Sequence, residues 1–159
     1  MKLSIVVEAR EDFELILPLI RKMDRFQKEG KYLFYRMVCI CQNHEEQEFK
    51  SCLKKYRLNV PYSFWKKNEE GIVSQDSKLP HFFSEDLFRH LPEMVLLLRY
   101  SYISSICAQK ANELLIPVGI LDNPESEVSW EEPHDYIFPI GIKNCWDLII
   151  HEIIKRFKL

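Results

Sequence analysis

Glycine is scarce in this chain of 159 residues, and its positions argue against two phosphate-binding motifs. The four glycines, Gly30, Gly71, Gly119 and Gly141, lie far apart. None belongs to a glycine-rich turn that brings backbone amides onto a phosphate, as in the dinucleotide fingerprint or the P-loop. The Gly-x-Ser-x-Gly nucleophile elbow is missing as well. The sequence therefore argues against a nucleotide enzyme of either motif class.

Long hydrophobic runs and an excess of charge are also missing. A helix that spans a bilayer needs about twenty apolar residues, and no apolar run in this sequence approaches that length. We find no secretory signal or Arg-rich transit peptide at the start. The chain has 22 basic and 24 acidic side chains, a formal charge of -2. This balance argues against a protein that mainly coats nucleic-acid phosphates. Five cysteines in apolar or helical patterns favour a reducing compartment.

The stretch from Pro92 to Asp122 carries the clearest structural pattern. Met94 to Leu98 is an unbroken apolar run, typical of a strand that is covered on both faces of a parallel sheet. A helical apolar stripe and a second apolar run, Ile116 to Leu121, follow. Neighbouring parallel strands need such a crossover, of about thirty residues. The stretch is therefore predicted to form a strand–helix–strand unit.

Helical and strand patterns alternate along the rest of the chain. Further strands are expected at Tyr32 to Cys41, Val60 to Tyr62 and Tyr136 to Ile140. Helices are expected after Glu11, after His44, at Phe82 to Leu91 and after Asn144. The first residues are assigned as a short leader, and Ser63 to His81 and Asn123 to Asp135 as irregular. We predict one domain, 1–159, with an α/β fold: a three-layer sandwich on a parallel sheet of four or five strands, flavodoxin-like or Rossmann-like.

One set of sulfur and imidazole groups could ligate zinc. It consists of Cys39, Cys41 and His44, with Cys52 one helix further on. The spacing differs from the usual pair of zinc knuckles, and the two strand cysteines are expected to pack under a helix as small apolar side chains. We favour this buried interpretation and predict neither a metal nor another cofactor.

The carboxyl ends of the strands form a second candidate site, because ligands bind there in open parallel sheets. The polar residues expected at this edge are Asn43, His44, Arg99, Tyr100, Asp122 and Asn123. An acid, a base and an amide there could hold a metal-phosphate or transfer protons. A small-molecule or nucleotide-binding enzyme would use Asp122, His44 and Arg99. A flavodoxin-like signalling module is a further alternative.

Basic side chains and a tryptophan could contact RNA. The candidates are Lys54, Lys55, Arg57, Trp65, Lys66 and Lys67. An aromatic ring among lysines suits phosphate contact and base stacking, although lysines at a helix end also complement the helix dipole. The acidic loop from Pro124 to Asp135 is the candidate for protein contact. Its contact residues would be Glu125, Glu127, Trp130, Glu131 and Glu132.

The run from Ala111 to Asp122 resembles a motif of the small-ribosomal-subunit protein S-two family. That family shows an Ala-x-x-Leu-x-Ile-Pro-Val run ending in Asp, and then an Asp-Tyr-x-Ile-Pro step that Asp135 to Pro139 resembles. Gly30 to Phe34 is similar to the family's Gly-Lys-Ile-Leu-Phe strand. The family's basic N-terminal segment and its projecting helical hairpin have no counterpart here.

The resemblance implies a divergent organellar member of this ribosomal family. Such a protein would be a non-enzymatic, structural constituent of the mitochondrial small ribosomal subunit, located in the mitochondrial matrix. It would contact small-subunit rRNA and neighbouring ribosomal proteins and support translation. We accordingly expect no small-molecule substrate and no membrane partner.

Overall fold

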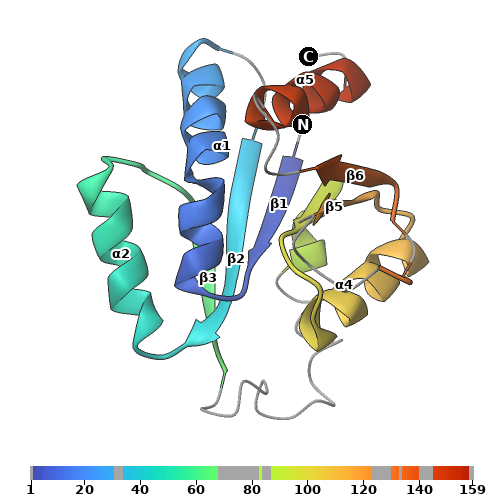
Figure 1. The fold of residues 1–159 in the computed structure, drawn as a ribbon, viewed down its shortest axis with the longest axis horizontal. Helices are drawn as coiled ribbons and strands as arrows, with labels where there is room; N and C mark the ends of the chain where they lie inside the picture. The colour runs from blue at the N-terminus through green and yellow to red at the C-terminus, as the bar shows by residue number, and fades with distance from the viewer. Residues whose placement is uncertain are drawn as a thin grey trace.

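The computed structural model describes a six-stranded parallel sheet with helices on both faces (Figure 1). The described residues are 2–30, 34–67, 83, 87–122, 130–132, 134–139 and 145–157. The strands are β1 (Lys2–Val7), β2 (Phe34–Gln42), β3 (Tyr62–Lys67), β4 (Met94–Leu97), β5 (Val118–Asp122) and β6 (Tyr136–Pro139). The helices are α1 (Arg10–Lys28), α2 (Glu45–Lys55), α4 (Tyr102–Glu113) and α5 (Cys145–Phe157), with a single 3-10 turn at Phe88–His90.

The strand order is β3-β2-β1-β4-β5-β6, and every neighbouring pair is parallel. This is the order of the Rossmann fold, in which the chain builds one half of the sheet outward from β1 and then the other half outward from β4. One apolar core lies between the sheet and α1, α2 and α5. A second core lies between the sheet and α4. The predicted three-layer α/β architecture is confirmed.

β1 is the strand that the sequence interpretation missed, because its residues were assigned to a leader. It pairs with β2 along its whole length, from Lys2 opposite Phe34 to Val7 opposite Cys39. On its other side it pairs with β4. A strand in the middle of a parallel sheet is buried on both faces, which explains why its apolar run barely alternates. The sheet therefore has six strands instead of four or five, and β1 lies at its centre.

β3 corrects a second expectation, since the residues from Ser63 to Lys67 were predicted to be irregular. They form most of an edge strand that pairs with β2, with Trp65 opposite Ile40. An edge strand has a neighbouring strand on one side only. The side chains of β3 are therefore mostly half-buried, and the alternation of apolar and polar residues in its sequence is weak. The rest of the predicted irregular segment lies outside the described residues.

α1 continues through Pro18, which stands inside the helix. The helix begins at Arg10, and Pro18 lies on its exposed side. The opposite side buries Phe13, Ile16 and other apolar residues completely. Of the short helix predicted from Phe82 to Leu91, the structure describes Phe83 and Leu87, which have π-helical geometry, and the 3-10 turn that follows them. No helix among the described residues is long and apolar enough to cross a membrane.

Candidate functional site

The carboxyl edge between β1 and β4 is where the strand order of the sheet reverses. After β1 the chain turns toward β2, and after β4 it turns toward β5. Side chains at such a switch point line the crevice in which open α/β sheets bind ligands. Glu8 follows β1, while Arg99 and Ser101 follow β4. Both α1 and α4 start at this edge, at the lower end of the sheet in Figure 1.

Glu8 is a buried carboxyl group at this switch point. Only 4% of the residue is exposed, and its Oε1 accepts a hydrogen bond of 2.7 Å from the hydroxyl of Ser101. Burial raises the pKa of Glu8, while the Ser101 hydrogen bond and the charges of Lys67 and Arg99 partly oppose this rise. A carboxyl group with a raised pKa can hold a proton nearer neutral pH and release it again, as general acid–base catalysis requires.

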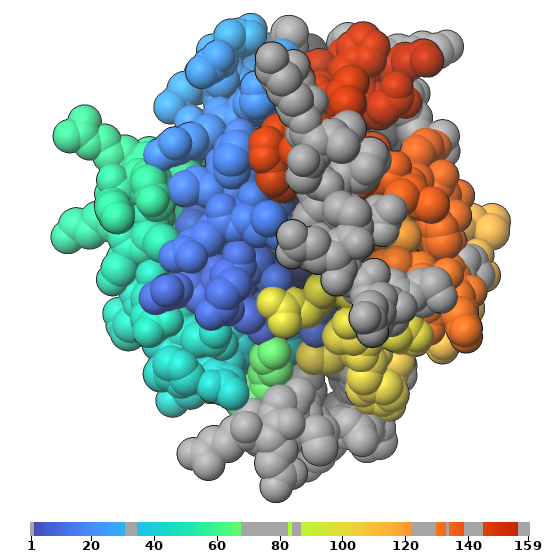
Figure 2. All heavy atoms as spheres, in the orientation of Figure 1, coloured from blue at the N-terminus to red at the C-terminus, as the bar shows by residue number. Residues whose placement is uncertain are grey.

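Asp12 joins the two turns that form the site. Its carboxylate accepts hydrogen bonds from Arg99, at 3.0 Å from Nε and 2.5 Å from Nη2. Its Oδ2 also accepts the backbone N–H of Glu8 at 2.9 Å. In Figure 2 the yellow atoms that follow β4 lie against the blue atoms at the start of α1. Asp12 thus fixes the backbone of Glu8 relative to β4.

Ser101 begins α4 and holds Glu8 at the same time. Its side chain accepts the backbone N–H of Ser104 at 3.0 Å, and the side chain of Ser104 accepts the backbone N–H of Ser101 at 2.8 Å. This reciprocal capping box satisfies two backbone donors that the first helical turn leaves unpaired. The Ser101 hydroxyl, which donates its hydrogen bond to Glu8, is therefore held in place by the capped start of α4.

Glu8 and Asp12 were not among the candidates from the sequence. Both are acidic residues that follow the β-branched run Ile5 to Val7 and lie at or near the start of a helix. That pattern would have indicated the edge of a strand if β1 had been recognised. The approach of Arg99, 87 residues further along the chain, depends on the pairing of β1 with β4.

The residues predicted for the edge are divided among three strands. Arg99 and Tyr100 lie at the switch point, as expected of the carboxyl end of β4. Asn43 and His44 are exposed at the end of β2. Asp122 ends β5, and Asn123 lies outside the described residues. Of the three residues predicted for an enzyme, Arg99 contacts Asp12, whereas His44 is exposed at the end of β2.

The six predicted RNA-binding residues form two groups, which lie toward opposite ends of the strands. Lys54 and Lys55 form the last turn of α2, and Arg57 follows it, whereas Trp65, Lys66 and Lys67 belong to β3. Since α2 runs against the strands and has 11 residues, its length of about 16 Å separates its end from the carboxyl edge. Of the six, Lys67 is close enough to Glu8 for its charge to lower the pKa of that carboxyl group.

The protein-contact candidates lie partly outside the described residues. Glu125 and Glu127 lie outside the described residues. Glu131 is exposed, whereas Trp130 packs against the core beside α4 and Glu132 accepts a hydrogen bond from Ser105. Trp130 and Glu132 are thus attached to the start of α4.

The strand cysteines are buried, as predicted. Cys39 and Cys41 lie in the core beneath α1 and α2. Burial raises the pKa of both thiols, to about 12 for Cys41. His44 is exposed at the start of α2. Among the described residues no group of three or more His, Cys, Asp and Glu side chains could hold a metal ion.

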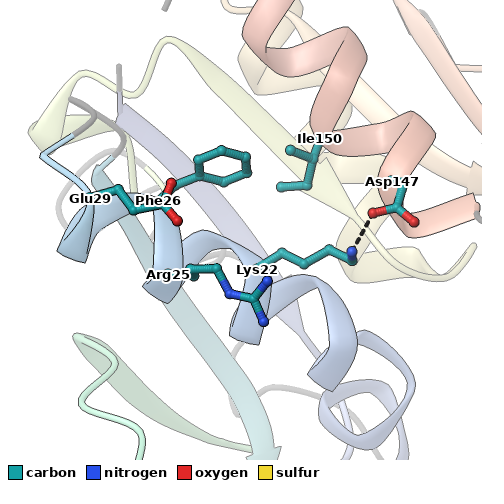
Figure 3. A pocket seen from close by; sticks show the side chains of 6 residues that line it. All are labelled: Lys22, Arg25, Phe26, Glu29, Asp147 and Ile150. Carbon is teal, nitrogen blue, oxygen red and sulfur yellow. Dashed lines mark hydrogen bonds and ion pairs between the residues drawn. The ribbon is translucent and has the colours of Figure 1, made fainter.

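A hollow between α1 and α5 lies away from this edge (Figure 3). Its volume is about 240 Å³, less than the roughly 300 Å³ of small ligand pockets. It is lined by Lys22, Arg25, Phe26, Glu29, Asp147 and Ile150. An ion pair of Lys22 with Asp147 bridges one side of it. The mixed charges and small size favour the switch point as the candidate site.

The chain is similar in fold to UDP-GlcNAc 2-epimerases. The enzyme from Methanocaldococcus jannaschii superimposes with a TM-score of 0.63 at 16% identity, over 97% of this chain and 43% of that chain. The Neisseria meningitidis enzyme, solved with bound UDP-GlcNAc, gives a TM-score of 0.60 at 15% identity, over 83% and 36%. This chain therefore spans less than half the length of these enzymes. No protein-family model and no curated protein matches it.

These neighbours overturn the ribosomal interpretation. The similar structures are enzymes of nucleotide-sugar chemistry, so the resemblance to the S-two family is wrong. The expected non-enzymatic role in translation is wrong as well. The same holds for the expected rRNA and ribosomal-protein partners and for the expected lack of a small-molecule substrate. The physical reason is that the matching motif, Ala111 to Asp122, covers the end of α4 and the buried strand β5. Any parallel sheet covered by helices needs such a pattern. The mitochondrial location and the domain limits, 1–159, stay predictions.

Proposed function

We propose that this chain is part of a nucleotide-sugar enzyme, and that the carboxyl edge between β1 and β4 receives the sugar. The observation that carries the proposal is Glu8, a buried carboxyl group with a raised pKa at the switch point of the sheet. Titratable groups shifted by burial, with a defined charged partner in a crevice, are typical of catalytic sites. The fold similarity to UDP-GlcNAc 2-epimerases supports the choice of ligand.

The chemistry of the first turn favours the sugar over the diphosphate. The turn after β1 reads Glu8-Ala9-Arg10 and contains no glycine, so it lacks the close-fitting amides of a phosphate loop. A carboxyl group in that place would repel a phosphate. Carboxylate oxygens and serine hydroxyls accept and donate the hydrogen bonds that sugar hydroxyls need. Arg99, whose side chain is 42% exposed, can still meet a nearby anion.

Glu8 would act as a proton-transfer group. Inversion at a sugar carbon that carries hydrogen requires removal of a proton and its return to the opposite face. The ionised form of Glu8 would take the proton from sugar carbon 2 while the bond between carbon 1 and the UDP oxygen breaks, so that the electron pair forms a C1=C2 double bond and UDP leaves. A proton donor on the opposite face and the return of UDP to carbon 1 would complete the inversion. Asp12 would keep the Glu8 backbone in place through the 2.9 Å hydrogen bond.

Isothermal titration calorimetry with UDP-GlcNAc tests the proposal. We expect the chain to bind this ligand and Glu8→Gln to weaken binding about tenfold, since a charge-assisted hydrogen bond contributes roughly 1.5 kcal/mol. Glu113→Gln is the control, because Glu113 lies at the far end of α4 and is largely exposed. Absence of binding, or equal affinities of the wild type and Glu8→Gln, would contradict the proposal.

Isotope exchange tests the proton transfer itself. The chain would be incubated with UDP-GlcNAc in heavy water, and the signal of the hydrogen on sugar carbon 2 would be followed by NMR. Loss of that signal with the wild type and its persistence with Glu8→Gln is the expected result. Binding without any exchange would reduce the role of the chain to ligand binding.

A further inference from the structure

Tyr100 is an exposed aromatic side chain that is held at both ends. It directly precedes Ser101, the residue that binds Glu8, and 38% of it is exposed. Its ring meets the ring of Trp130 edge to face, with centroids 5.0 Å apart and planes at 89°. Its hydroxyl donates to Oε1 of Glu132 at 3.1 Å. An exposed ring with such contacts has little freedom to lose when it binds a ligand.

Glu132 ties this aromatic pair to α4. Its Oε1 also accepts a hydrogen bond of 2.6 Å from the hydroxyl of Ser105, which lowers the pKa of Glu132. The carboxylate therefore stays charged and remains a strong acceptor for Tyr100. Trp130, two residues before Glu132, packs against the apolar core on the α4 side of the sheet. The position of Tyr100 is thus set by groups that are themselves anchored.

The aromatic pair and the buried carboxyl group lie at the same helix start. Glu8 binds Ser101 and Glu132 binds Ser105, and these two serines are one helical turn apart, about 6 Å between their Cβ atoms. A ligand that hydrogen-bonds to Glu8 would therefore have Tyr100 as a close neighbour. The site combines a polar group with an aromatic wall, as small-molecule sites usually do.

We propose that Tyr100, held by Trp130 and Glu132, is the platform on which the sugar ring of the ligand packs, and that it sets the preference for a nucleotide sugar over the free nucleotide. The inference rests on the proposed function and names the part of the ligand that this edge recognises. A pyranose ring presents C–H groups on one face, which pack against an aromatic ring, while its hydroxyls reach Glu8.

The test compares the affinities for UDP-GlcNAc and for UDP by calorimetry. We expect the wild type to prefer UDP-GlcNAc and Tyr100→Ala to reduce this preference about 3- to 10-fold, the range for loss of one aromatic contact. Tyr100→Phe keeps the ring and should keep the preference. Tyr102→Ala is the matched control, since Tyr102 is an even more exposed tyrosine in the first turn of the same helix.

A single-tryptophan variant provides a measurement that keeps Tyr100 intact. The chain has three tryptophans, so Trp65→Phe with Trp146→Phe leaves only Trp130. Its emission should change on addition of UDP-GlcNAc and stay constant on addition of UDP. This readout does not depend on the folding of a Tyr100 variant.

Three outcomes would overturn the inference. One is an unchanged preference in Tyr100→Ala while Glu8→Gln weakens binding; the proposed function would then stand and only the platform would fail. Another is a silent Trp130 in the single-tryptophan variant although UDP-GlcNAc binds. The third is no binding of UDP-GlcNAc at all, which would remove both the proposed function and the platform.

Discussion

The bidentate contact between Asp12 and Arg99 joins the two halves of the sheet at its carboxyl edge. Asp12 belongs to the first turn of α1, and Arg99 follows β4. The same carboxylate binds the backbone of Glu8. The buried side chain of Asp12 therefore sets the geometry of the switch point, because it joins two turns whose residues lie 87 positions apart in the sequence.

Replacing Asp12 by Asn tests this role. The variant keeps the shape of the side chain and removes the charge that Arg99 faces, so we expect the free energy of unfolding to fall by about 1–3 kcal/mol, less than for a fully buried pair because Arg99 is partly exposed. Urea unfolding gives the value. Asp147→Asn, in an exposed ion pair with Lys22, should change it by less than about 1 kcal/mol. Equal losses in the two variants would deny Asp12 a special role.

The raised pKa of Glu8 predicts a pH dependence of stability with a definite sign. Above its ordinary value of 4.5 the unfolded chain releases the Glu8 proton while the folded chain still holds it. Stability from this group is therefore complete below pH 4.5 and is lost as the pH rises through the folded-state pKa. Subtracting the pH profile of Glu8→Gln from that of the wild type, both by urea unfolding, isolates the effect. A difference that grows with rising pH in favour of the wild type would contradict it.

Ser101→Ala should act on both the helix and the carboxyl group. Loss of an N-cap side chain costs about 1 kcal/mol, so amide hydrogen exchange should speed up in the first turn of α4. Because the Ser101 hydroxyl lowers the pKa of Glu8, its removal should raise that pKa further. NMR titration of the Glu8 carboxyl carbon measures the shift. Ser101→Thr keeps the hydroxyl and serves as the control; a similar shift in both variants would exclude the hydroxyl as its cause.

Gly119 is required by the close packing of β5 against its neighbours. A Cβ at this position would collide with the Met94 Cε and lie 2.8 Å from Cε2 of Phe138. Overpacking of this kind costs about 1–3 kcal/mol, which we expect for Gly119→Ala in thermal or urea unfolding. Met94→Leu in the same background removes the Cε and should recover part of the loss. No recovery would show that the strain arises elsewhere.

The layers could be predicted from the sequence because periodicity depends on local chain geometry. The apolar run at Met94 to Leu98 and the stripe of α4 follow from two-sided burial and from the helical repeat. β1 was missed because its apolar run is short and stands at the start of the chain. β3 was missed because an edge strand buries too little for a clear pattern.

The candidate site was harder to predict, and one motif misled. The Ile-Pro-Val run of β5 is a property of buried parallel strands in general, so its likeness to a ribosomal family carried no functional information. Arg99 was placed correctly at the carboxyl edge, but its partners were not, because charge and spacing do not reveal which strands are neighbours.

The sequence by itself determined the α/β class, the burial of the strand cysteines and the lack of a glycine-rich phosphate loop. These depend on residues that are close together in the chain. Only the tertiary structure decided that β1 and β4 lie side by side, and thereby that Glu8 meets Ser101 and Asp12 meets Arg99. Strand pairing is a long-range choice, set by the packing of whole layers, and the chemistry of the site depends on that choice.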